Sequence, residues 1–307
     1  MNAFPEYVTR FLRHCKSEKN LDPKTIKAYS IDFKQFLEFH KTATTIPQRQ
    51  DLDKELLRDY FQHLQIQYKP KTVKRKIASL KALLNFLEIE DLILFNPFRK
   101  LRIHIKEPFM LPRVMTLNEV KKLFRVAYHT LAESNEERKN NVSRDISILE
   151  LLFATGIRVS ELCNLASEDV NLSAQYIKVF GKGKKERIIP ICTTEIVDVL
   201  RNYHSSNSAN TFFFLNRLHK RISEQSVRFM VNKYARVAGL RFITPHVFRH
   251  TFATQLLEQG VDIKYIQQLL GHSSILTTQI YTHVSKRKQR EILTKKHPRI
   301  HIKSITF

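Results

Sequence analysis

Residues 244–257, TPHVFRHTFATQLL, hold strong local signals for both the fold and the chemistry of this chain. Thr244 and Pro245 form an N-cap and first-turn pair, and Gly260 is a typical helix stop. The stretch therefore predicts a helix over residues 245–258. The 307 residues contain only 6 glycines and no tryptophan, which fits a mainly helical protein.

One face of this expected helix carries a cationic cluster. His246, Arg249 and His250 are spaced i, i+3 and i+4, so they lie together. Two histidines four residues apart can bind zinc, but Val247 stands where metalloproteases have a glutamate. An arginine between two ligands also opposes a dication. The cluster therefore favours a phosphate anion over a metal.

A second segment, ATGIRVSEL (154–162), ends one helix and starts another. Gly156 ends the first helix. Arg158 opens the second, where its guanidinium group joins the free backbone amides to favour a phosphate. Glu161 lies one turn later and is placed to hold Arg158 in one rotamer. Taken alone, the segment favours a surface ion pair.

A third segment, LGHSSILTTQIYTH (270–283), brings in His272 and Tyr281. A lone tyrosine on a helix is usually a packing residue. Combined with two arginines and two histidines, Tyr281 becomes a candidate nucleophile. Upstream, two β-rich runs flank GKGK (181–184) and predict a hairpin with a basic tip.

The first hundred residues predict four helices, one of which has a strongly basic face. The expected ranges are 3–17, 23–40, 53–65 and 71–87. In the last of these, an apolar stripe recurs at helical spacing through Val73, Ile77, Leu80, Leu84 and Leu87. The other face carries Lys71, Lys74 and Arg75, and residues 60–87 hold six cations and no carboxylate. A solvated helix face is the ordinary explanation, but a face that carries only positive charge over this length favours contact with phosphates.

Residues 103–115 predict an interdomain linker, because they carry Pro108 and Pro112 without a helical period. Thr116 and Glu119 then form a capping box. The elements expected after it are helices near 116–128, 143–154, 194–204, 223–238, 245–258, 262–270 and 274–283, with strands at 175–180 and 186–191. The expected domains are residues 1–102 and 116–307.

Positive charge extends over both expected domains. Lys and Arg number 52 against 29 Asp and Glu. Through residue 110 there are 21 cations and 13 anions, an excess of +8, and the remainder has 31 and 16, an excess of +15. This suggests two domains that share one polyanion, with nucleic acid as the first candidate, although a solubility surface would also explain the charge.

The cysteines and the hydrophobic pattern indicate the cellular compartment of the protein. Cys15, Cys163 and Cys192 are odd in number and far apart, which argues against a disulfide framework and fits a reducing cytoplasm. There is no apolar run of 18 residues and no signal-peptide core. We expect a cytoplasmic protein without a membrane segment.

Together these segments resemble the tyrosine recombinase/integrase family, most closely its Xer branch. The matching motifs occur in family order: ATGIRVSEL, GKGKKERIIP, HVFRHTFATQLL, LLGHSSILTTQIYTHV and KHPR (296–299). The N-terminal helices resemble the family's core-binding domain more weakly. By motif, the resemblance implies a catalytic set of Arg158, Lys182, His246, Arg249, His272 and Tyr281, with Glu161 in support.

The resemblance also implies the reaction. Tyr281 would join the DNA through a 3′-phosphotyrosyl bond, without a metal or another cofactor. Lys182 resembles the family's general acid, and His246 resembles its general base. His272 would hydrogen-bond the phosphate, and His250 is at most a supporting residue. Further phosphate contacts are expected from Lys184 and Lys185, either of which is also a weaker candidate for the acid.

The architecture implied by the resemblance is a two-domain clamp around double-stranded DNA. Its N-terminal domain would be helical, and its catalytic domain mostly helical with a small sheet. Four protomers, identical or of two kinds, would act on two synapsed sites through a Holliday junction. A DNA translocase or other accessory activator could assist. The preferred role is Xer-type dimer resolution, and integration of a mobile element or phage is the alternative.

Two segments carry further expectations. Residues 284–299 hold seven cations and one carboxylate, and we expect them to dock into a neighbouring protomer through Ile292 and Leu293. A frayed basic tail is the alternative. Residues 133–141 are longer than usual for the family and are expected to form a surface loop.

Two other kinds of protein remain possible from the residues. A type IB topoisomerase shares the chemistry but acts as a monomer. A nonenzymatic regulator would use the expected helices at 262–270 and 274–283 as a helix-turn-helix. Such a regulator would not need the arginines, histidines and tyrosine together.

Overall fold

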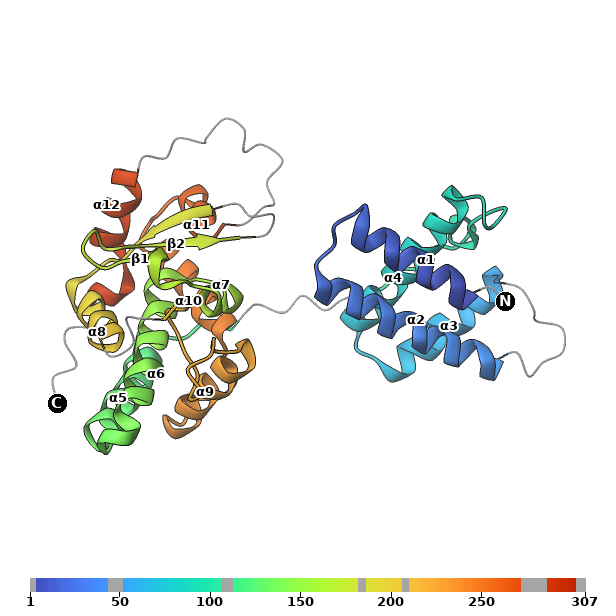
Figure 1. Ribbon diagram of the computed structural model, residues 1–307. Coiled ribbons are helices and arrows are strands. Elements are labelled where there is room, and N and C mark those ends of the chain that lie inside the picture. The colour runs from blue at the N-terminus through green and yellow to red at the C-terminus, as the bar shows by residue number, and fades with distance from the viewer. Residues whose placement is uncertain are drawn as a thin grey trace. The chain divides into compact units, whose positions relative to one another are not determined.

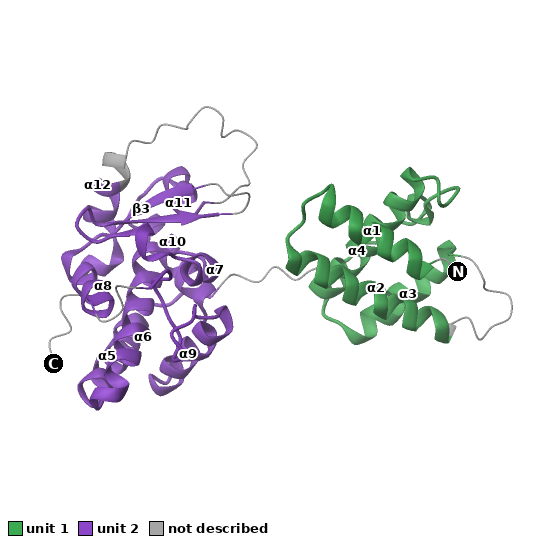
Figure 2. Ribbon diagram, viewed as in Figure 1, with its two compact units in different colours: residues 1–110 green, residues 111–307 purple. Residues whose placement is uncertain are grey.

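The computed structural model describes residues 4–43, 52–106, 113–181, 186–205, 210–271 and 286–301. The chain divides into two compact units, residues 1–110 and 111–307 (Figure 2). Each unit has its own hydrophobic core. Helices dominate both units, and the second also contains a three-stranded sheet (Figure 1). The expected mainly helical class is confirmed.

The first unit consists of helices packed around one core. They are α1 (Phe4–Ser17), α2 (Pro23–Ala43), α3 (Lys54–Gln67) and α4 (Pro70–Ile89), followed by the 3₁₀ helix η1 (Pro97–Lys100). These α-helices confirm the four expected from sequence, with ends shifted by at most three residues. Helix α4 packs against the other three. Its apolar stripe is buried, as its spacing predicts.

The basic face of α4 is less uniform than its sequence suggests. Lys71 and Lys74 are exposed. Arg75 forms an ion pair with the buried Asp32 of α2. Lys76 is itself buried, and its Nζ lies 3.0 Å from Asp32 Oδ1. Two of the six cations in residues 60–87 therefore help to join α2 and α4.

Both ends of the segment expected as a linker pack against a core. Leu101, Ile103 and Ile105 are partly buried against the core of the first unit. Met115 is fully buried in the second unit, and its amide donates to Thr251 Oγ1 at 2.9 Å. The prolines of the segment lie outside the described residues.

The second unit surrounds one central helix with helices and a small sheet. Its helices are α5 (Leu117–Ala132), α6 (Glu136–Thr155), α7 (Val159–Cys163), η2 (Ser167–Asp169), α8 (Thr194–Ser205), α9 (Glu224–Val237), α10 (Pro245–Glu258), α11 (Ile263–Leu270), α12 (Lys286–Lys296) and η5 (Pro298–His301). The antiparallel sheet has the order β1 (Val170–Asn171), β2 (Tyr176–Phe180) and β3 (Glu186–Pro190). Strand β1 was not expected. The expected helix at 274–283 lies outside the described residues.

Helix α6 is the centre of this unit and corrects one expectation. Residues 133–141 were expected to form a loop, but α6 begins at Glu136. Asn135 caps it by accepting a hydrogen bond from the Arg138 amide, and acidic residues in the first turn suit the positive end of a helix. From Asp145 to Thr155 every residue is buried, because α5, α8, α9 and α10 pack around it (Figure 1).

The C-terminal segment corrects a second expectation. Ile292 and Leu293 were expected to dock into a neighbouring protomer. Instead they are buried in the core of their own unit, because α12 folds back beside β3. No helix in the described part of the chain is long and apolar enough to cross a membrane.

Candidate active site

The site begins at the corner between α6 and α7. Gly156 caps α6 with a left-handed φ of 60°. A Cβ atom at this position would lie 2.6 Å from Phe252 Cδ1 and 2.9 Å from Leu270 Cδ2. Glycine is therefore needed both for the backbone conformation and for the close packing of α10 and α11. The turn brings Arg158, the N-cap residue of α7, next to these helices.

Three arginines from three elements converge on the end of α11. Arg187 Nε donates to Leu269 O at 2.9 Å, Arg249 Nη2 to Leu270 O at 2.7 Å, and Arg158 Nη2 to Gly271 O at 2.8 Å. The last carbonyls of a helix lack intrahelical partners and form its negative end, which suits cations. Arg249 Nη1 also donates to Gly156 O at 2.8 Å. The contacts thus join α11, α10 and the Gly156 corner.

Glu161 connects two of these arginines. Its Oε1 accepts from Arg158 Nη1 at 2.7 Å and from Arg187 Nη1 at 2.9 Å. Its Oε2 accepts from the Arg158 amide at 3.0 Å and from Arg187 Nη2 at 2.8 Å. The contact between Glu161 and Arg158 is the one expected from their spacing. The role of Arg187 was not foreseen, because its partner lies 26 residues away.

The electrostatics keep this cluster charged. Burial would raise the pKa of Glu161, but the hydrogen bonds and charge of Arg187, followed by those of Arg158, hold it below its ordinary value. Burial, followed by the charge of Arg158, lowers the pKa of Arg249 to about 10. Arg249 therefore remains protonated at neutral pH. Three guanidinium charges against one carboxylate leave an excess of two positive charges.

His246 lies at the edge of the cluster, exposed in the first turn of α10. Desolvation, followed by the charges of Arg228, His250 and Arg249, lowers its pKa below the ordinary value of 6.5. The imidazole is thus largely neutral at pH 7 and can accept a proton. His250 is also exposed. Of the residues expected at the site, Arg158, Glu161 and Arg249 are joined by described contacts.

The remaining expected residues lie outside the described part of the chain. They are Lys182, Lys184, Lys185, His272 and Tyr281. Lys182 follows Gly181 directly in sequence, and His272 follows Gly271, whose carbonyl binds Arg158. Among the described residues, no group of three or more His, Cys, Asp or Glu side chains could hold a metal ion.

A second buried polar cluster fixes the end of the chain to α6. Arg299 Nε lies 3.1 Å from Glu150 Oε2, and Glu150 Oε1 accepts from the Tyr128 hydroxyl at 2.9 Å. Nearby, the buried ring of His297 packs against Phe153 and Phe252, with centroids 5.6 Å away in both cases. Phe252 is the residue that packs on Gly156. The KHPR motif is therefore anchored behind the arginine cluster, within its own unit.

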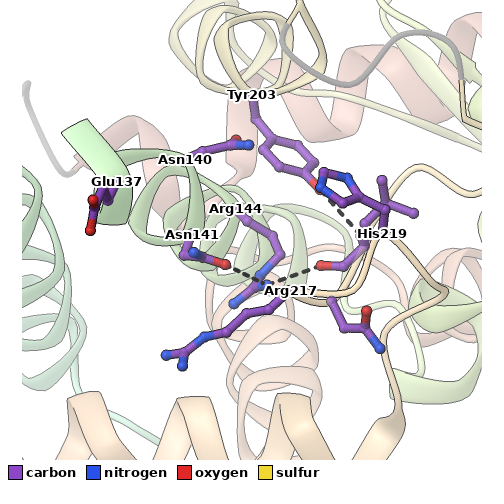
Figure 3. Close-up of a pocket in the computed structure, with 9 residues that line it drawn as sticks. Glu137, Asn140, Asn141, Arg144, Tyr203, Arg217 and His219 are labelled. Carbon is purple, nitrogen blue, oxygen red and sulfur yellow. Dashed lines mark hydrogen bonds between the residues drawn. The ribbon is translucent and has the colours of Figure 1, made fainter.

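A separate hollow of about 180 Å³ opens beside the first half of α6 (Figure 3). Arg144 at its wall donates to Asn141 Oδ1 and to Leu215 O, and pairs with Asp145 at 2.7 Å. These contacts tie α6 to the chain that follows α8. None of the residues that line the hollow belongs to the expected catalytic set.

Comparison with known proteins places these features in a family. Residues 113–288 match the model of the phage integrase family, and residues 8–91 match that of the phage integrase N-terminal SAM-like domain. A tyrosine recombinase of Agathobacter rectalis is 46% identical over 97% of this chain and 98% of its own length. Tyrosine recombinase XerC of Thermodesulfovibrio yellowstonii is 39% identical over 95% and 96%.

A solved structure shares the fold. It is XerH site-specific recombinase bound to palindromic difH substrate in a post-cleavage complex. It superposes with a TM-score of 0.71 and 22% identity, covering 92% of this chain and 83% of XerH. The relatives match nearly the full length of the chain, and the family models match both units. The chain therefore belongs to the phage integrase family and is a Xer-like, site-specific tyrosine recombinase.

Proposed function

We propose that Tyr281 attacks a DNA backbone phosphate held by the arginine cluster. The tyrosine oxygen would form a bond to phosphorus while the bond to the 5′-oxygen breaks, leaving a 3′-phosphotyrosyl link and a free 5′-hydroxyl. A 5′-hydroxyl from a partner strand then reverses the step. The observation that supports this most is the convergence of Arg158, Arg249 and Arg187 on residues 269–271, a segment that ends ten residues before Tyr281.

The excess positive charge of the cluster is suited to the transition state. A pentavalent phosphorus carries additional negative charge on its equatorial oxygens, and Arg158 and Arg249 can compensate it as a metal would. His246 is proposed as the base for the tyrosine proton, since its lowered pKa keeps it neutral. By family resemblance, Lys182 would protonate the leaving 5′-oxygen, and His272 would hydrogen-bond the phosphate.

The substrate in this proposal is double-stranded DNA. Exposed Lys71 and Lys74 on α4, with Arg75, would contact phosphates from the first unit, and Lys184 and Lys185 would do so from the second. By resemblance to the family, four protomers would act on two synapsed sites through a Holliday junction. Xer-type dimer resolution is the preferred role, with an accessory activator such as a DNA translocase. Three buried free cysteines fit a cytoplasmic location.

The test is covalent capture on DNA. Footprinting on the DNA that flanks the gene locates the binding site, and a duplex nicked near the cleavage point then traps the cleaved intermediate. Wild-type protein should form a covalent complex, and Tyr281→Phe should form none because it lacks the attacking oxygen. Binding of the same duplex by Tyr281→Phe, measured by mobility shift, should be retained.

Three outcomes would contradict the proposal. A covalent band that persists in Tyr281→Phe would exclude Tyr281 as the nucleophile. Specific binding by the wild type without any covalent complex would favour a DNA-binding regulator. Relaxation of supercoiled DNA without strand exchange on paired sites would favour a topoisomerase.

A further inference from the structure

Arg187 is held more completely than the other two arginines of the site. Both Nη atoms bind the carboxylate oxygens of Glu161, at 2.9 and 2.8 Å, and Nε binds Leu269 O at 2.9 Å. A Cβ atom at Gly271, where φ is 64°, would approach Arg187 Nη1 to 2.9 Å. The guanidinium group of Arg187 is thus packed between β3, α7 and the end of α11.

Arg187 and Arg158 differ in how much they face solvent, and Arg249 is buried. The side chain of Arg187 is 14% exposed, against 32% for Arg158. Because both Nη atoms and Nε of Arg187 already donate hydrogen bonds within the protein, few of its N–H groups are left for a DNA phosphate. Arg158 uses Nη1 for Glu161 and Nη2 for Gly271 O, and its greater exposure leaves N–H groups for a ligand. Arg187 is therefore better placed to act on Glu161 than on a phosphate.

The charge of Arg187 matters because Glu161 is nearly buried, with a side chain 4% exposed. In such a setting, a carboxylate paired with Arg158 alone would cancel most of the positive field that Arg158 offers to an anion. Arg187 supplies a second cation to the same carboxylate. With it, Arg158, Arg187 and Glu161 together carry one net positive charge.

We propose that Arg187 is a positioning residue for strand cleavage, which fixes Glu161 and balances its charge so that Arg158 stays oriented and available to the phosphate. The inference rests on the proposed function of Arg158. In this role Arg187 does not touch DNA. The alternative is a purely structural tie that joins β3 to α7 and α11.

The test compares two scissile phosphates in the nicked duplex. One is the natural phosphodiester. The other is a methylphosphonate, in which a methyl group replaces one nonbridging oxygen and removes the negative charge that Arg158 would stabilise. The proteins are wild type, Arg187→Met, Arg187→Lys and Arg158→Ala. Arg201→Met is the matched control, since Arg201 forms an exposed pair with Asp198.

On the phosphodiester, Arg187→Met should lower the cleavage rate by about 100-fold, the loss typical of a misplaced catalytic group. DNA affinity should change little. Arg187→Lys should be intermediate, because it keeps the charge but loses the two-pronged contact. On the methylphosphonate, both variants and Arg158→Ala should approach the wild-type rate. Arg201→Met should match the wild type on both duplexes.

Other results would overturn the proposal. An Arg187→Met rate equal to wild type on the phosphodiester would do so, as would an equal loss on both duplexes. Rescue by a 5′-bridging sulfur, a leaving group that needs no proton, would instead assign the defect to leaving-group protonation. If Arg187→Met fails to give a wild-type circular dichroism spectrum, Arg187→Lys decides the same comparison. Failure of the wild type to form any covalent complex would reject the proposed function itself.

Discussion

Two buried carboxylates of the second unit, Glu150 and Glu161, are bound by arginines in different ways. Glu150 is bound by one arginine, Arg299, and by a neutral phenol, so its charge is balanced. Glu161 is shared by Arg158 and Arg187, and Arg249 adds a third guanidinium group nearby. One cluster is neutral, and the other has an excess of positive charge.

This difference separates a contact that stabilises the fold from one that can bind a ligand. A balanced, buried pair satisfies both partners and leaves nothing for a third group. A cluster with excess positive charge in a partly buried place gains from an anion, and a DNA phosphate is the anion that the family acts on.

The largest effect on stability is expected at the balanced pair. Arg299→Met should lower the free energy of unfolding by about 3–5 kcal/mol, because it leaves the Glu150 carboxylate buried without a cation. Urea denaturation followed by circular dichroism measures this. Adding Glu150→Gln should recover part of the loss, since the amide oxygen can still accept from Tyr128. Arg201→Met at an exposed pair should cost less than about 1 kcal/mol.

If Arg299→Met changed stability no more than Arg201→Met does, the distinction between the clusters would fail. The same would follow if Arg299→Met lost cleavage activity while its stability was unchanged.

A smaller effect is expected in the pH profile of cleavage. A base must be unprotonated, and the pKa of His246 lies below 6.5 through desolvation and the neighbouring charges of Arg228, His250 and Arg249. The cleavage rate should therefore fall on acidification only below pH 6.5, as His246 becomes protonated. Single-turnover cleavage rates, measured over a range of pH at constant ionic strength, give the midpoint of this fall.

His246→Gln should abolish the fall in cleavage rate at acidic pH, because the amide does not titrate. A midpoint above 6.5 would contradict the account, since it would place the base in an environment that favours its protonated form.

Local signals account for the parts of the fold that were predicted well. Helix α10 spans Pro245–Glu258, as expected from its N-cap, its first-turn proline and the glycine beyond it. The stripe of α4 is likewise a property of one segment. The start of α6 also has a local signal, in the N-cap Asn135 and the two glutamates after it. Strand β1 has two residues, too few for any periodicity.

The contacts of the candidate site also fall into those that local sequence predicts and those that it does not. Glu161 and Arg158 are three residues apart, so one helix turn predicts their contact. Arg187 reaches Leu269, 82 residues away, and Arg158 reaches Gly271, 113 residues away. Such contacts depend on tertiary packing, which no local pattern contains. The burial of Leu293 in its own unit is missed for a related reason, since its segment, residues 284–299, holds seven cations and one carboxylate and lacks a helical apolar stripe.

We infer that the charge around Glu161 serves the reacting phosphate, and Arg158→Ala tests this role most directly. Single-turnover cleavage of the nicked duplex should slow by about 100- to 1,000-fold, as for the loss of one donor to a transition-state oxyanion. The unfolding midpoint and DNA affinity should stay close to wild type. A cleavage rate within about threefold of wild type would contradict the account.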